Sequence, residues 1–118
     1  MFGFFKNKHE VKVPLQNWRI PVADEYRKIV NEDSIQFVNA DESICLYFSV
    51  LIVSGNSLFS QDVFTSKAPS VNRVANGWAF KATKSGGKEL LVCVFCFIND
   101  SDEALMRKLY EEIVYTGK

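Results

Sequence analysis

Two stretches of the chain alternate between polar and apolar residues and then become continuously apolar, as β-hairpins often do. In the first, alternation at 35–37 is followed by turn formers at 39–42 and an apolar run at 44–53. In the second, alternation at 78–82 is followed by the turn KSGG and an apolar run at 90–98. A continuous apolar run predicts a strand covered on both faces. We therefore predict two hairpins whose apolar strands lie in the middle of an antiparallel sheet.

A helical spacing of apolar residues follows Pro21. Four side chains share one face of such a helix, namely Val22, Tyr26, Ile29 and Val30. Proline is favoured in a first helical turn, and here acidic residues precede basic ones in the order that complements a helix dipole. This pattern predicts a short amphipathic helix.

The C-terminal segment predicts a second helix, of about four turns. Its apolar stripe consists of Leu105, Leu109 and Ile113, flanked by Met106, Tyr110 and Val114. Asp100 followed by Glu103 matches a capping box, and Gly117 stands where glycine commonly ends a helix. A stripe of this kind has to cover one face of a sheet.

The remaining segments are less regular. Residues 1–10 have no clear period and predict a loose N-terminal arm, and 11–13 predict a short strand that ends at Pro14. Residues 58–76 fit either a short helix followed by a strand or a structured loop. We see no internal linker, so the sequence predicts one α+β domain over 1–118. Its mostly antiparallel sheet is built from two hairpins, and helices cover both faces in an αβα-like sandwich.

Charge and hydropathy narrow the class of partner. Fourteen basic and fourteen acidic residues cancel, so nothing favours binding to nucleic acid or to an anionic membrane surface. The longest apolar runs are shorter than the roughly 20 residues of a membrane-spanning helix. The N-terminus has aromatic residues before lysines, the reverse of a signal peptide. We therefore expect a cytoplasmic protein.

Cys93 and Cys96 have the C-x-x-C spacing of redox centres and zinc sites. Residues three apart on a strand point to opposite faces, so these two thiols cannot bind one metal ion or form a disulfide with each other. Redox C-x-x-C motifs lie instead at a helix N-terminus. Cys45 is expected to neighbour one of these thiols across the sheet. We interpret all three cysteines as apolar residues of buried strands.

The other motifs give no catalytic set. The turn SGGK at 85–88 lacks the upstream glycine of a phosphate-binding loop and leads into a strand. The paired acidic residues lie on expected helix faces, caps or turns, where carboxylates are solvated. The sequence therefore predicts no enzyme, no cofactor and no metal ion.

Two family resemblances agree with this interpretation. The segment from Val11 to Trp18, a strand followed by Pro14 and a tryptophan, resembles the start of proteins with the Mog1/PsbP-like fold. The apolar strand, turn and helix that end at 111–116 are similar as well. The order of elements over 22–115 also resembles the secretion-chaperone-like α+β fold. Members of both folds mostly act as binding or adaptor modules, so the resemblance implies a binding domain without an active site.

Three functions remain open from the sequence. The first is a protein-binding or adaptor domain whose contact residues include Trp18, Phe59, Phe64 and Trp78, since aromatic side chains dominate interface energetics. The second is a domain that binds a small apolar ligand in an aromatic pocket. The third is an enzyme that uses Cys45 or Cys93. A homodimer through a sheet edge is compatible with each of them.

Overall fold

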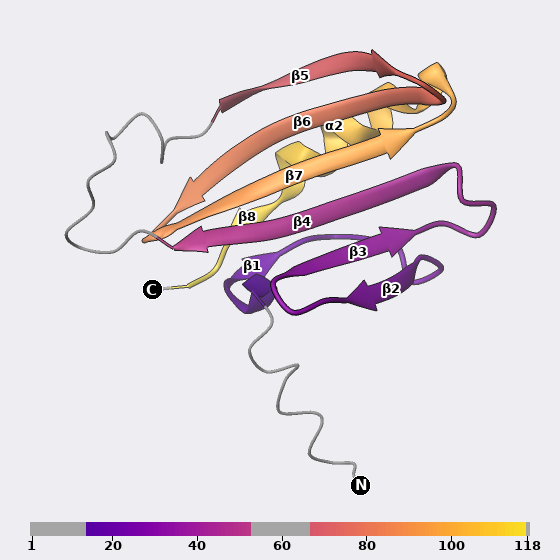
Figure 1. Ribbon diagram of the computed structural model, residues 1–118. Helices are drawn as coiled ribbons and strands as arrows, with labels where there is room; N and C mark the ends of the chain where they lie inside the picture. Colours follow the sequence, from indigo (N-terminus) through magenta and orange to yellow (C-terminus); the bar gives the residue numbers. More distant parts are fainter. Residues whose placement is uncertain (1–13, 53–66, 118) are drawn as a thin grey trace, which may run out of the picture.

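The computed structural model describes residues 14–52 and 67–117, which form one large antiparallel sheet with a single α-helix (Figure 1). The strands of this sheet are β2 (Arg27–Val30), β3 (Ser34–Val38), β4 (Ile44–Ile52), β5 (Lys67–Val74), β6 (Gly77–Gly86) and β7 (Glu89–Phe97). They lie in the order β2-β3-β4-β7-β6-β5, and every neighbouring pair is antiparallel. The other elements are the 3-10 turns η1 (Pro14–Asn17) and η3 (Asp100–Asp102), the helix α2 (Glu103–Glu112), and the short pair β1 (Trp18–Arg19) and β8 (Val114–Tyr115).

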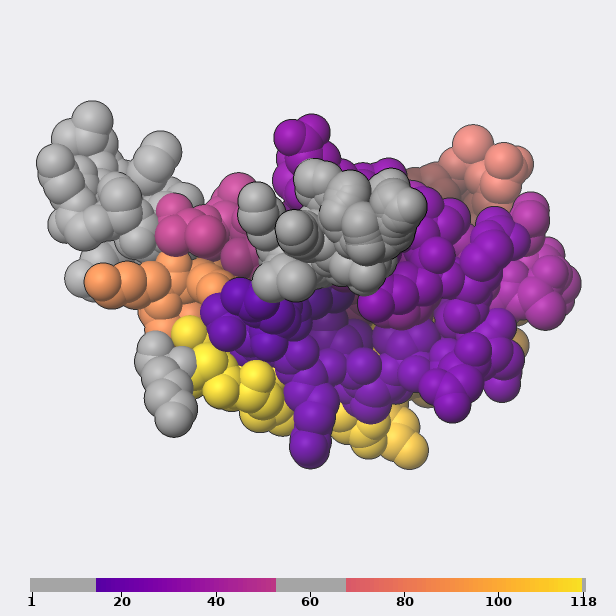
Figure 2. Space-filling view, turned by 90° about the horizontal axis from the view of Figure 1, so that it is seen from below, coloured from indigo at the N-terminus to yellow at the C-terminus, as the bar shows by residue number. Residues whose placement is uncertain are grey.

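The predicted αβα-like sandwich is wrong, because the described residues place helix on one face of the sheet only. In Figure 1, α2 lies behind the sheet, and no described element crosses its front. The turn η1 leads into β1, and α2 is followed by β8. The paired strands β1 and β8 lie on the same side of the sheet as α2, where Trp18 and Ile113 join the core. Figure 2 shows the indigo residues from Pro14 onward beside the yellow C-terminal segment. The two hairpins, by contrast, form as predicted.

The predicted helix after Pro21 does not form. The chain turns here, with the Tyr26 N–H donating to the Ala23 carbonyl at 3.2 Å, and then enters strand β2. β2 pairs with β3 along its whole length, from Arg27 opposite Val38 onward. The β-branched residues in this segment suit a strand, and pairing with β3 satisfies its backbone groups, which outweighs a weak local helical pattern.

The C-terminal helix is shorter than predicted. Asp100 begins a 3-10 turn, and no side-chain hydrogen bond caps α2 at its N-terminus, so the predicted capping box is wrong. Leu105 is 47% exposed, whereas the neighbouring Met106 is buried against the sheet. After Glu112 the backbone becomes extended at Ile113, and β8 pairs with β1. Gly117 therefore does not end the helix.

Glycines fix the two tight turns between β5, β6 and β7. Gly87 has φ 57° in the turn between β6 and β7, and the next residue, Lys88, does not have a positive φ. That combination is typical of a type II′ turn, which requires glycine at its first central position. At Gly77, where φ is 153°, an added Cβ would clash with the Phe97 carbonyl oxygen. Gly77 therefore allows the close approach of β6 to the end of β7, and Gly87 allows the tight turn between them.

The core lies between the sheet and α2 and is built around three fully buried phenylalanines. The rings of Phe80 and Phe95 are stacked with centroids 5.2 Å apart, and Phe48 meets Phe95 edge-to-face at 5.4 Å. Lys84 links the sheet to the end of α2, since its ammonium donates to the carbonyls of Tyr110 at 2.7 Å and Ile113 at 3.0 Å. A cation at this place also complements the helix dipole.

The N-terminal part of the described chain is attached to the sheet by one carboxylate. Glu89, at the start of β7, accepts hydrogen bonds from the Asn17 amide at 2.7 Å and from the Trp18 indole N–H at 2.8 Å. Trp18 also packs edge-to-face against Tyr115 of β8. These contacts explain why Trp18 is only 6% exposed.

Candidate functional site: the open face of the sheet

The sheet face opposite α2 is called here the open face. Strand register places the same side of β3, β4, β6 and β7 on it. Its accessible centre consists of Gln36, Cys45, Tyr47, Ser49, Lys81, Thr83, Val92, Val94 and Cys96. Each of these is half-buried or exposed, whereas Ala79 and Leu90 on the same face are buried. The open face is therefore a mixed surface with an aromatic residue, Tyr47, in its middle strand.

The open face has an uneven charge. Among the strand residues of this face whose side chains are described, the charged ones are Lys81 and, on β2, Arg27, and none is acidic. The acidic residues of the described strands and helix lie elsewhere, with Glu89 on the opposite side of the sheet and Glu103 on α2. The described strands therefore give this face a positive charge.

Both edges of the sheet carry residues that oppose the addition of another strand. The β2 edge is short and has Arg27 and Lys28, and the β5 edge has Pro69 and Arg73. Charged side chains and proline are common protections of exposed strand edges. The sequence prediction that allowed a homodimer through a sheet edge stays a prediction, and these edges give it no support.

The aromatic residues predicted as contacts do not come together. Trp18 is buried and hydrogen-bonded to Glu89, so it serves the core. Trp78 is half-buried at one end of the sheet, and the Arg73 guanidinium lies 5.0 Å from its ring centre. Phe59 and Phe64 lie outside the described residues. Tyr47 was not predicted as a contact residue from the sequence. It could have been if only one helix had been expected, because its strand would then be covered on one face only.

The three cysteines occupy different environments. Cys93 lies in the core at 0% exposure, whereas Cys96 is exposed on the open face, so the C-x-x-C pair points to opposite sides of the sheet, as the strand geometry predicts. Burial raises the pKa of the Cys93 thiol to about 12, and the nearby Lys84 ammonium opposes that increase in part. Cys45 is half-buried directly opposite Cys96. The expectation that all three are buried is therefore wrong for Cys96 and only partly correct for Cys45.

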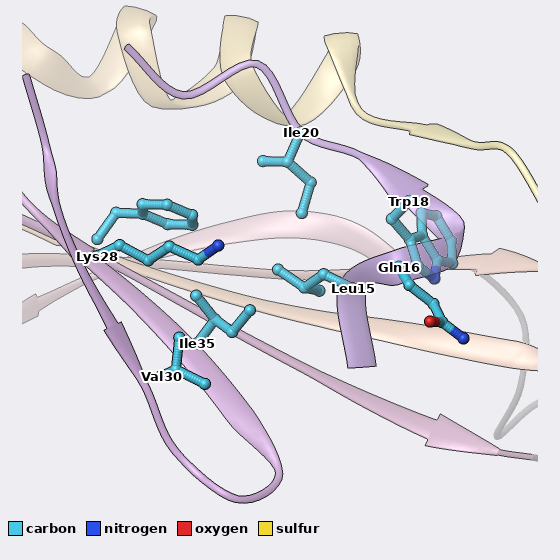
Figure 3. Close-up of a pocket in the computed structure, with 8 residues that line it drawn as sticks. Leu15, Gln16, Trp18, Ile20, Lys28, Val30 and Ile35 are labelled. Atoms are coloured by element: carbon cyan, nitrogen blue, oxygen red, sulfur yellow. The ribbon is translucent and has the colours of Figure 1, made fainter. Parts of the chain in front are cut away.

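A hollow of about 440 Å³ lies on the helix side, between η1 and the β2–β3 hairpin (Figure 3). Its walls are mostly apolar and consist of Leu15, Gln16, Trp18, Ile20, Lys28, Val30, Ile35 and Phe37. In Figure 3 the Lys28 ammonium points into the hollow between Ile20 and Leu15. The volume is within the usual range for small-ligand sites, roughly 300–1,000 Å³. The sequence left open an aromatic pocket for an apolar ligand, but it did not predict this hollow or the place of Lys28 in it, because η1 and β2 are adjacent only in the folded chain.

Within 14–52 and 67–117, no cluster of three or more His, Cys, Asp or Glu side chains is arranged to hold a metal ion. The one α-helix described is too short and too polar to cross a lipid bilayer. Comparison of the whole chain with known proteins gives no match to a protein-family model, to a curated protein or to a solved structure.

Proposed function

We propose that this chain is a non-enzymatic binding domain whose open face contacts another protein. The observation that supports this most directly is the absence of a covering layer, among the described residues, over the accessible centre around Tyr47, Val92 and Val94. Apolar and aromatic residues surrounded by polar ones resemble the composition of a protein–protein interface, with an apolar core and a polar rim.

The charge of the open face defines the chemistry of the partner. Lys81 is exposed near Tyr47 and Val94, and none of the described strand residues on this face is acidic. A partner that buries Tyr47 under an apolar patch and places a carboxylate beside Lys81 would match both features. Such complementarity mainly increases the association rate and selects the partner, while the aromatic contact supplies affinity.

Two substitutions on the open face test this proposal. The tagged full-length chain is used to capture partners from its own host, and the dissociation constant of the captured protein is then measured. We expect Tyr47→Ala to weaken binding by at least about 30-fold, the equivalent of roughly 2 kcal/mol for a central aromatic contact. We expect Lys81→Glu to slow association and to remove its dependence on salt.

The matched controls lie on α2, beside the segment that follows Pro21. Leu105 and Lys108 are exposed there, on the opposite side of the molecule from Tyr47. We expect Leu105→Ala and Lys108→Glu to bind the captured protein like the wild type, with melting temperatures of all four variants reported. Equal loss of binding in the control variants contradicts the proposal. The proposal is also contradicted if the purified chain forms a homodimer that Tyr47→Ala disrupts, because the partner is then a second copy of this chain.

The hollow in Figure 3 favours a second candidate function, the binding of an apolar carboxylate. Its walls would hold an alkyl chain, and the Lys28 ammonium would pair with the carboxylate. Decanoate at about ten times its dissociation constant should raise the melting temperature by about 4–6 °C. Lys28→Met should abolish that shift, whereas Lys108→Met on α2 should keep it. A wild-type melting temperature unchanged by decanoate excludes this function.

A further inference from the structure

The register of β4 and β7 places two thiols side by side on the open face. Cys45 is the cross-strand partner of Cys96, and both side chains leave the sheet on the side opposite α2. The Ile98 N–H donates to the Ser43 carbonyl at 3.0 Å, and the register continues from there without a shift. Ser43 and Ile98 are therefore a hydrogen-bonded pair. Such pairs recur at every second position of an antiparallel ladder, so Cys45 and Cys96 also form a hydrogen-bonded pair, with Cα atoms about 5.5 Å apart.

That separation suits a disulfide bond. Bridged cysteines usually have Cα atoms about 4.4–6.8 Å apart. Their Cβ atoms lie about 3.5–4.5 Å apart, whereas directly opposite residues in a sheet have Cβ atoms about 4.5–5.5 Å apart. The two strands would therefore have to approach each other locally. We infer that Cys45 and Cys96 form a reversible cross-strand disulfide, which makes this pair a thiol-oxidation site on the open face. A strained and accessible disulfide is also easy to reduce.

The two thiols have different roles in the oxidation by a small disulfide such as oxidised glutathione. The exposed Cys96 thiolate attacks one sulfur atom, the bond between the two glutathione sulfurs breaks, and one glutathione thiolate leaves. The Cys45 thiol then loses its proton to solvent and attacks the Cys96 sulfur of this mixed disulfide. The second glutathione leaves as a thiolate and takes up a proton from solvent. Two protein thiols have then lost two electrons to one glutathione disulfide.

The surroundings support this division of roles. Cys45 is half-buried, and burial raises its pKa, as does Cys96 beside it, so Cys45 suits the second step better than the first. A hollow of about 410 Å³ at this end of the sheet is lined by both thiols and by Trp78, which gives a small disulfide access to Cys96. Cys93 does not compete, because it is fully buried on the other face.

The test is oxidation of the purified full-length chain with excess oxidised glutathione, followed by mass spectrometry without reduction. We expect the main product to have lost the mass of two hydrogen atoms. Tandem mass spectrometry of the digest should locate the bridge between Cys45 and Cys96. Millimolar reduced glutathione should restore the original mass. This measurement needs no partner, so it does not depend on the proposed binding function.

Three variants sharpen the test. Cys45→Ser should stop at the first step and keep one glutathione on Cys96, and Cys96→Ser should give neither bridge nor adduct. Cys93→Ala should form the bridge like the wild type. If this core variant fails to fold, the location of the bridge in the wild type shows whether Cys93 takes part in it. A wild-type chain that keeps a stable glutathione adduct on Cys96, forms covalent dimers or links Cys45 to Cys93 would overturn the inference.

Discussion

Phe95→Ala is expected to lower the free energy of unfolding by about 3–5 kcal/mol, the range for removing a buried aromatic ring. Phe95 has 0% exposure and lies in the middle of β7, between the rings of Phe48 and Phe80. Its removal leaves a cavity under α2 and breaks both ring contacts at once. Because domains of this size are stable by only about 5–15 kcal/mol, the loss is a large share of the total.

Urea denaturation followed by circular dichroism measures this effect, and the neighbouring residue supplies the control. Val94 lies on the same strand but points to the open face, where it is half-buried. Val94→Ala should cost about 1 kcal/mol or less. Phe95→Leu, which keeps most of the buried volume, should cost less than about 1.5 kcal/mol. Equal losses for Val94→Ala and Phe95→Ala would show that the core does not lie on the Phe95 side.

The strands of the sheet could be predicted from the sequence because the information is local. The apolar runs that contain Phe48 and Phe95 are too short for most helices, rich in β-branched and aromatic residues, and bounded by turn formers. The turn at Gly87 adds a second local signal that agrees with the first. Where propensity, pattern and turn chemistry agree, the structure follows them.

The interpretation of these runs as strands covered on both faces was wrong for an instructive reason. Val92 and Val94 are apolar, yet they lie on the open face, where they are only half-buried. An apolar residue at an accessible position is ordinary in proteins, so an apolar run does not by itself require a covering layer on each side. The helix predicted after Pro21 would have supplied a second covering element, but that segment forms a turn and strand β2 instead.

The candidate site could not be predicted because it depends on distant parts of the chain. Trp18 was predicted as a contact residue, but Glu89, which is 71 positions away, holds its indole in the core. Only the register of β4 and β7 decides which of the other two thiols lies next to Cys45. A shift of one residue would exchange Cys96 for another partner. Local patterns carry neither kind of information.

The buried thiol of Cys93 should make the protein unstable at alkaline pH. In the unfolded chain this thiol ionises with a pKa near 9.0, whereas burial raises its pKa in the folded protein to about 12. Between these values the unfolded state has lost the proton and the folded state keeps it, so the free energy of unfolding falls as the pH rises. Cys93 contributes a slope of about 1.4 kcal/mol per pH unit, so about 2 kcal/mol is lost near pH 10.5.

Comparison with Cys93→Ala isolates this contribution. Burial also raises the pKa of Tyr26 and Tyr110 and lowers the pKa of Lys84, but these groups titrate in both proteins. Urea denaturation from pH 7 to 11 should show the variant less stable than the wild type at neutral pH, because a small cavity replaces the sulfur. Its stability should then fall less steeply above pH 9, so the two curves converge. Parallel curves would mean that Cys93 ionises alike in both states, and therefore that it is not enclosed between the sheet and α2.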